Sequence, residues 1–171
     1  MALIKAVKGK SPQIHKSVWL ADNATVVGDV HLAEGSNVWF NAVLRGDVCS
    51  IKMGKNCNIQ DGAVVHGTLD LSETVMGDNV SVGHNAIVHG CTIEDNVLIG
   101  MGAIVMDNAV IRSGAMIAAG AVVLANTEVE ANSLYAGTPA KKVKEIDEKL
   151  AQVIAKTPEH YKMYTSWIED L

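Results

Sequence analysis

An aliphatic side chain recurs every six residues along most of this chain. The residues in phase are Ile14, Leu20, Val26, Leu32, Val38, Leu44, Met53, Ile59, Val65, Met76, Val82, Val88, Ile93, Ile99, Val105, Ile111, Ile117, Val123 and Val129. The phase slips after Leu44, Val65 and Val88 and resumes each time. A small residue such as Ala24, Ala86 or Ala103 follows most of them four positions later, and Gly, Asn and Asp crowd the positions between. These polar residues are typical of tight corners.

A period of six fits neither an α-helix nor a simple alternating strand. It is typical of hexapeptide repeats, which fold as an all-β solenoid, a parallel β-helix of very short strands. Three hexads make one triangular coil, so the 19 in-phase residues predict about six coils. At roughly 4.8 Å per coil the prism would be about 30 Å long. The period does not set the hand of the coil, since parallel crossovers are ordinarily right-handed.

The repeat predicts a β-helix domain over residues 1–137 and a helical segment over 138–171 that packs along the prism. Residues 145–156 place Ile146, Leu150 and Ile154 on one helical face. The pair Thr157 and Pro158 is typical of a cap and first helical position, which predicts a second helix from there.

Composition narrows the class of protein. Only 4% of residues are aromatic, so the core must consist of aliphatic side chains. A formal net charge of -5 argues against a nucleic-acid partner, because nothing would neutralise phosphates. No segment approaches the roughly 20 apolar residues of a membrane helix. Cys49, Cys57 and Cys91 are odd in number and lack a CxxC spacing, which favours reduced thiols in a cytoplasmic protein.

The repeat also assigns outward-facing residues to columns. Leu44, Val65 and Val88 begin hexads that are three apart, so they lie on one side of the prism in successive coils. The residue after each one points outward. Arg45, His66 and His89 therefore form one column. Histidines in neighbouring coils, about 4.8 Å apart, can bind a single metal ion.

A second column holds Asp61 and His84, which lie two residues past Ile59 and Val82 on the preceding side of the prism. Because adjacent sides of a prism diverge, His84 should point away from His66 and His89 of its own chain. A homotrimer would solve this, with the column of Arg45 facing the Asp61 and His84 column of the next subunit. Arg45 and Asp61 would then pair across the interface, and Asp47 beside Arg45 would join them.

Three neutral imidazoles leave the fourth position of a tetrahedral ion open, as in catalytic zinc sites. Such a metal lowers the pKa of bound water to about 7 and supplies hydroxide at neutral pH. The sequence thus predicts His66, His84 and His89 as ligands of a metal shared between chains.

The motif LRGDVCSIKMGKNCNIQDGAVVHG, followed by VGHNAIVHGC, resembles the γ-class carbonic anhydrase-like family over roughly residues 10–145. The resemblance implies a left-handed coil, a trimer, and zinc, or in some preparations iron or cobalt. It implies that His66 and His89 of one subunit bind the metal with His84 of the next. Gln60 matches a glutamine that hydrogen-bonds the metal-bound hydroxide, and Tyr161 falls where bacterial homologues place a tyrosine near the metal. Arg45, Asp47 and Asp61 match the family's interface charge network.

The chain departs from the best-known active member of that family at Val48, where that member has a glutamate. That member also carries a longer acidic loop after the first histidine, with a glutamate proposed to shuttle protons. Here the insertion is short, and neither Asp70 nor Glu73 aligns with that glutamate. Fast hydration needs proton export, so weak activity is compatible with the resemblance.

Three functions remain open on the sequence. The first is metal-dependent hydration of carbon dioxide to bicarbonate by a lyase. The second is transfer or hydrolysis of a coenzyme A thioester, since AGTPAKKV also occurs in hexapeptide acyltransferases. The third is a non-catalytic metal-binding assembly module. His15, His31 and His160 match nothing in the pattern and are expected at the surface.

Overall fold

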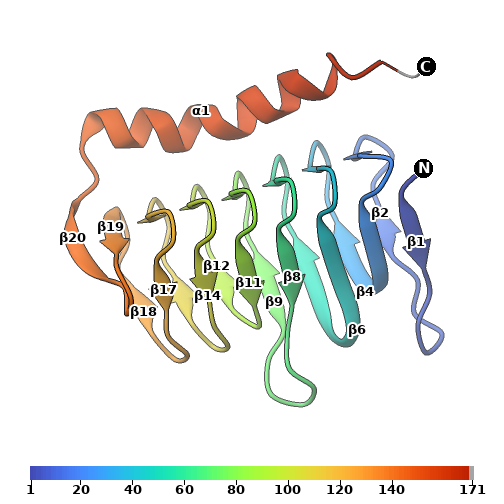
Figure 1. Ribbon diagram of the computed structural model, residues 1–171, viewed down its shortest axis with the longest axis horizontal. Coiled ribbons are helices and arrows are strands. Elements are labelled where there is room, and N and C mark those ends of the chain that lie inside the picture. Colours follow the sequence, from blue (N-terminus) through green and yellow to red (C-terminus); the bar gives the residue numbers. More distant parts are fainter. Residues whose placement is uncertain (170–171) are drawn as a thin grey trace.

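Short parallel strands stack in seven turns along one axis, and a single helix, α1 (Glu148–Thr165), runs beside them (Figure 1). The computed structural model describes residues 1–169. The predicted parallel solenoid with a C-terminal helix is confirmed, while the left hand of the coil stays a prediction.

Two sheets make up the solenoid. The 12-stranded sheet contains β1 (Leu3–Lys5), β2 (Gln13–Ile14), β4 (Thr25–Leu32), β6 (Val43–Met53), β8 (Val64–His66), β9 (Thr74–Met76), β11 (Ile87–His89), β12 (Thr92–Ile93), β14 (Ile104–Val105), β15 (Val110–Ile111), β17 (Val122–Val123) and β18 (Glu128–Val129). The 8-stranded sheet contains β3 (Trp19–Leu20), β5 (Asn37–Val38), β7 (Asn58–Ile59), β10 (Ser81–Val82), β13 (Leu98–Ile99), β16 (Met116–Ile117), β19 (Ser133–Ala136) and β20 (Lys141–Glu145). All strand pairs are parallel except β19 with β20.

The register follows the six-residue period. Val65 pairs with Leu44 on one side and with Val88 on the other. All of the in-phase aliphatic residues are buried except Ile14 and Leu20, which lie half-buried in the first coils. Each coil therefore contributes three inward side chains to one continuous core.

The predicted count of about six coils is too low by one. Ile4 of β1 is in register with Val26 and adds one position before the repeat, although Ile4 is 51% exposed. Ile4 is out of phase with the six-residue repeat because the chain makes an extra turn between Val7 and Lys10. Tyr135 of β19 stacks on Ile117 and adds one position after the repeat. Tyr135 keeps the six-residue phase but is aromatic rather than aliphatic.

Asparagine occupies many of the corners. Eight asparagines have a positive φ, including Asn79 at 57° and Asn96 at 57°. This left-handed conformation is strained for most residues and tolerated by asparagine. The amide of Asn79 also donates to Oδ1 of Asn96 one coil away, at 3.1 Å. The corners are thus stabilised both by backbone preference and by side-chain ladders.

The predicted pair of helices is wrong, because residues 1–169 contain one helix. Residues 141–145 form the strand β20, and α1 begins after Asp147, whose carboxylate accepts from the N–H of Leu150 at 2.9 Å. The helix continues through Pro158 despite its missing N–H. Ile154 and Pro158 are the buried residues of α1, so packing offsets that loss. The division at residue 137 stays a prediction.

Aromatic side chains hold the C-terminal half of α1 against the solenoid. The ring of Tyr161 meets the ring of Trp39 edge-on, with centroids 5.3 Å apart, and Tyr164 continues the cluster. The helix contacts β5, β7 and β10, so it covers the 8-stranded sheet. Within residues 1–169, no helix has the length and apolar character to cross a membrane.

The left-handed corners generate a stability prediction. Replacing Asn96 with alanine should lower the free energy of unfolding by about 1–2 kcal/mol, since alanine is strained at this φ. Asn96→Gly should cost less, because glycine adopts the conformation freely. Urea unfolding of both variants would measure the difference, and an alanine variant as stable as the glycine variant would contradict it.

Candidate functional site

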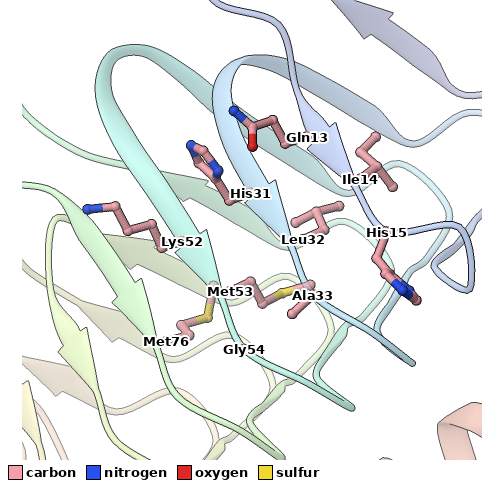
Figure 2. A pocket seen from close by; sticks show the side chains of 10 residues that line it. All are labelled: Gln13, Ile14, His15, His31, Leu32, Ala33, Lys52, Met53, Gly54 and Met76. Atoms are coloured by element: carbon pink, nitrogen blue, oxygen red, sulfur yellow. The ribbon is translucent and has the colours of Figure 1, made fainter.

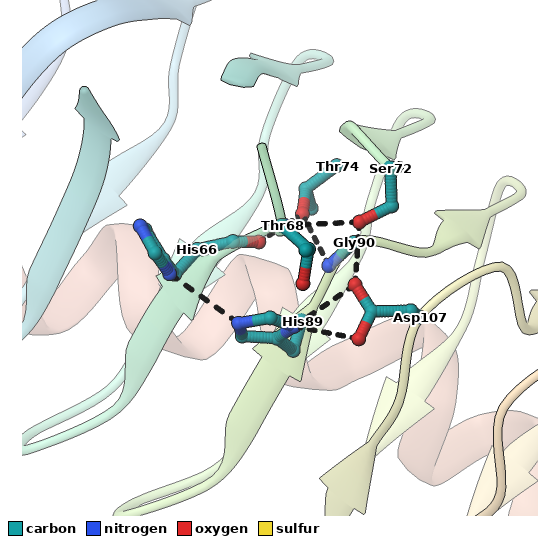
Figure 3. A network of polar contacts seen from close by, with 7 residues as sticks. All are labelled: His66, Thr68, Ser72, Thr74, His89, Gly90 and Asp107. Carbon is teal, nitrogen blue, oxygen red and sulfur yellow. Dashed lines mark hydrogen bonds and ion pairs between the residues drawn. The ribbon is translucent and has the colours of Figure 1, made fainter. Parts of the chain in front are cut away.

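His66 and His89 lie side by side on adjacent coils, as the register predicts. They are paired residues of β8 and β11. Nδ1 of His66 faces Nε2 of His89 at 3.3 Å, and the ring centroids are 5.3 Å apart (Figure 3). Their side chains are only 15% and 30% exposed. We refer to these two residues as the histidine pair.

A carboxylate lies on the outer side of each ring. Oδ1 of Asp47 is 3.0 Å from Nε2 of His66. The two carboxylate oxygens of Asp107 are 3.1 and 3.2 Å from Nδ1 of His89. An ionised carboxylate only accepts, so in its neutral form each ring carries its proton on the outer nitrogen, the one that faces the carboxylate. The inner nitrogens then present two lone pairs to each other, an arrangement that favours a cation between them.

Both carboxylates are held in the ionised state. Burial works to raise the pKa of Asp47, but hydrogen bonds from His66 and Arg45 hold it below the usual value. Burial opposes ionisation of Asp107 as well, yet the hydrogen bond from Ser72 and the nearby His89 ring hold its pKa low. Nη1 of Arg45 lies 2.5 Å from Oδ2 of Asp47. Within the chain, Arg45 therefore pairs with Asp47, and its pairing with Asp61 across an interface stays a prediction.

A second group of side chains consists of Asp61, His84 and Tyr161, with Asp61 and His84 at the corner after β7 and β10. We refer to the histidine pair as the first half-site and to this group as the second half-site. Nδ1 of His84 is 2.9 Å from Oδ2 of Asp61, as expected for one column. The hydroxyl of Tyr161 on α1 is 3.0 Å from Nε2 of His84. Burial, and then the charge of Asp61, raises the pKa of Tyr161 to about 12. The phenol therefore stays protonated and donates to Nε2 of His84.

Gln60 ends β7 and is 5% exposed. Its Nε2 donates to Oδ1 of Asn58 at 2.9 Å, and Asn58 donates to the hydroxyl of Ser81 at 2.7 Å. This chain of bonds fixes the side-chain amide of Gln60. Gln60 lies in the chain between β7 and Asp61 of the second half-site.

The two groups lie on different sheets. The histidine pair belongs to the 12-stranded sheet, whereas His84 follows a strand of the 8-stranded sheet. Across residues 1–169, no cluster of three or more His, Cys, Asp or Glu side chains is arranged to hold a metal within one chain. The structure brings His66 and His89 together and leaves His84 apart, so a site shared between chains remains a prediction.

Sequence reasoning missed Asp107 and Ser72. Asp107 lies two residues past the in-phase Val105, in the coil that follows His89. A search for carboxylates one coil beyond each histidine would have found it. Ser72 lies in the insertion, whose conformation the repeat does not determine. Glu73 of the same insertion lies 3.2 Å from the ammonium of Lys52 rather than beside the histidine pair.

The histidines that match no motif lie elsewhere. His15 and His31 line a groove of about 490 Å³ on the N-terminal coils (Figure 2). His31 lies 2.9 Å from a carboxylate oxygen of Asp29. His160 is exposed on α1 and stacks on Tyr164.

Comparison with known proteins agrees with the fold. The family model for the bacterial transferase hexapeptide (six repeats) matches residues 73–106 and 90–125. A crystal structure of a hexapeptide transferase family protein from Anaplasma phagocytophilum superimposes with a TM-score of 0.93 at 36% identity, covering 98% of each chain.

The relatives that are similar in sequence indicate a narrower family than the hexapeptide-repeat fold does. A carbonic anhydrase of Geobacillus kaustophilus is 42% identical over 146 residues, which cover 85% of this chain and 80% of that protein. The mitochondrial gamma carbonic anhydrase 2 of Arabidopsis thaliana is 41% identical over 157 residues, or 89% of this chain and 56% of that protein. The chain belongs to the γ-class carbonic anhydrase-like family of hexapeptide-repeat proteins.

Proposed function

We propose that this protein is a lyase that hydrates carbon dioxide to bicarbonate at metal sites shared between the subunits of a homotrimer. The observation that carries the proposal is the histidine pair, whose inner nitrogens face each other at 3.3 Å between two outer carboxylates. The relatives named carbonic anhydrase support the reaction.

The donor set suits zinc, with iron or cobalt as alternatives. His66 and His89 would hold the ion with His84 of a second copy, and three neutral imidazole donors are typical of catalytic zinc. Histidine ligands commonly donate their other N–H to a carboxylate, as both rings of the pair do here. Bound zinc would acidify water to a pKa of about 7 and so provide a nucleophile at neutral pH.

The chain's own residues would prepare this site. In the neutral rings, Asp47 and Asp107 hold the proton on the nitrogen that faces each carboxylate, which leaves the inner nitrogens of the histidine pair as acceptors. The bond from Gln60 to Asn58 uses its amide N–H and leaves its carbonyl oxygen as an acceptor that could orient a nearby hydroxyl. Tyr161 would move its hydroxyl from Nε2 of His84 when that nitrogen binds the ion. The proton released by hydration would leave through buffer or a nearby side chain other than Val48, which cannot carry one.

Removal of one ligand tests the metal site. His66→Ala should reduce zinc from about one per chain to a small fraction of that, because two imidazoles hold zinc poorly. Carbon dioxide hydration should fall to the background rate. Metal analysis of anaerobically purified protein, paired with a hydration assay, provides the measurement. His31→Ala is the matched control, since the His31 ring contacts Asp29 on another part of the solenoid.

Acyl transfer from coenzyme A is the second candidate, favoured by the high structural similarity to a hexapeptide transferase family protein. Full retention of metal in His66→Ala, together with tight binding of acetyl-coenzyme A to metal-free protein in calorimetry, would overturn our proposal in favour of transfer or thioester hydrolysis. Hydration at the background rate by fully metal-loaded protein would instead favour a non-catalytic metal-binding module.

A shared site should permit complementation between subunits. A His84→Ala chain keeps the histidine pair, and a chain with His66→Ala and His89→Ala keeps His84. Equal mixing by joint refolding should restore about one quarter of the sites, since that share of interfaces combines the two intact halves in a cyclic trimer. Metal content and hydration rate would be measured on the mixture, with each variant refolded alone as control. No recovery would contradict a site between chains.

The Tyr161 hydroxyl should compete with metal for His84. In Tyr161→Phe this hydrogen bond is absent, so metal binding should tighten by up to about tenfold, for a bond worth roughly 0.5–1.5 kcal/mol. Competition with a chromophoric chelator measures the affinity. Tyr164→Phe, in the same aromatic cluster, is the control. Weaker binding in Tyr161→Phe would show that the hydroxyl supports the metal rather than competing with it.

A further inference from the structure

We propose that Asp107 is a positioning residue that sets the proton on His89 and ties the loop of residues 67–73 to the histidine pair. This inference rests on the proposed metal site and adds to it a residue outside the three ligands. Its observations are the contacts of Asp107 with His89 and with Ser72 (Figure 3).

The first contact fixes the ring of His89. Asp107 follows β14, one coil beyond β11, and its carboxylate points back toward the His89 ring. Both oxygens lie within 3.2 Å of Nδ1, so the ring has one strong acceptor on that side. With the proton held on Nδ1, Nε2 keeps its lone pair and faces His66. Asp47 plays the same part for His66 through the opposite nitrogen.

The second contact secures the loop. The hydroxyl of Ser72 donates to Oδ1 of Asp107, and the N–H of Thr68 donates to the same hydroxyl oxygen at 3.0 Å. At the loop's end, Thr74 donates to the carbonyl of His66 at 2.6 Å and accepts from the N–H of Gly90 at 3.0 Å. The loop is therefore bound to both strands that carry the histidine pair.

Glycine leaves room for this arrangement. Gly90 directly follows His89 and has a φ of +55°. A methyl group built on Gly90 would overlap the hydroxyl of Ser72 and the carboxylate of Asp107. Only a residue without a side chain lets the Ser72 hydroxyl and the Asp107 carboxylate meet beside His89. The contact between Ser72 and Asp107 therefore depends on glycine at position 90.

The consequence concerns the tautomer of His89. Without the carboxylate, a neutral imidazole is free to carry its proton on Nε2, and that tautomer offers no lone pair to an ion beside His66. Loss of a carboxylate that supports a histidine ligand commonly weakens metal binding by about 10–100-fold. Asp107 would thus act on the metal through His89 without touching it.

The experiment uses the full chain with Asp107→Leu, which has a similar size and no acceptor, and Asp107→Asn as a milder second variant. Asp95→Asn is the control, because its carboxylate accepts a backbone N–H from Asp78 at another corner. Nitrogen NMR of the histidine rings in metal-free protein near pH 8, where free histidine is neutral, reports the tautomer. Competition with a chromophoric chelator reports zinc affinity.

We expect the Nδ1–H tautomer for His89 in the parent chain and the Asp95 control. The Nε2–H tautomer should appear in Asp107→Leu, with zinc bound about 10–100-fold more weakly. Ser72→Ala should keep the tautomer while the amide of Thr68 exchanges faster. An unchanged His89 tautomer in both Asp107 variants would overturn the inference. If the parent chain binds no zinc, the proposed function fails, while the metal-free NMR result still decides the role of Asp107.

Discussion

Stacking of one aliphatic side chain per six residues is the constraint on which the other features depend. Each inward residue, such as Val65, contacts its counterparts in the coils before and after, and parallel backbone hydrogen bonds hold them in line. A shift of one residue would turn every inward side chain outward. The large buried apolar surface therefore fixes the register strongly. The same register brings His66 next to His89, so the geometry of a polar site is determined by an apolar core.

Two carboxylates then determine which nitrogens of the histidine pair can act as acceptors. Two neutral histidines on neighbouring coils could carry their protons in four combinations. Asp47 and Asp107 select one, in which both inner nitrogens are acceptors. The partial burial of both rings keeps water from satisfying these lone pairs freely. In the second half-site, Asp61 orients His84 in the same way, but the open nitrogen there is covered by Tyr161 of the chain's own helix.

Much of this architecture could be predicted from sequence because the repeat converts residue spacing directly into spatial columns. The pairing of His66 with His89 and of Asp61 with His84 followed from counting hexads. Features outside the repeat could not be counted in this way. Ile4 lay beyond an irregular turn, and the insertion that carries Ser72 has no period.

The helix illustrates a different limit. Pro158 has a local preference to begin a helix, but burial of Pro158 and Ile154 against the solenoid keeps α1 continuous. That continuity is what carries Tyr161 to His84, which no local pattern specifies. Asp107 was missed for yet another reason, since a single aspartate at a corner is indistinguishable from the many that only form turns.

In the proposed trimer, the division of the half-sites between two sheets would link metal binding to assembly. A single chain can offer an ion the histidine pair alone, since its own His84 lies on another sheet and is hydrogen-bonded to Tyr161. In the proposed trimer, each ion would bind the assembled form more tightly than the single chain, so its binding free energy would also stabilise the interfaces. Assembly would in turn bring the third imidazole to the histidine pair, so a monomer should bind metal poorly. The solenoid keeps the half-sites apart within each chain, and the activity would then be a property of the interface.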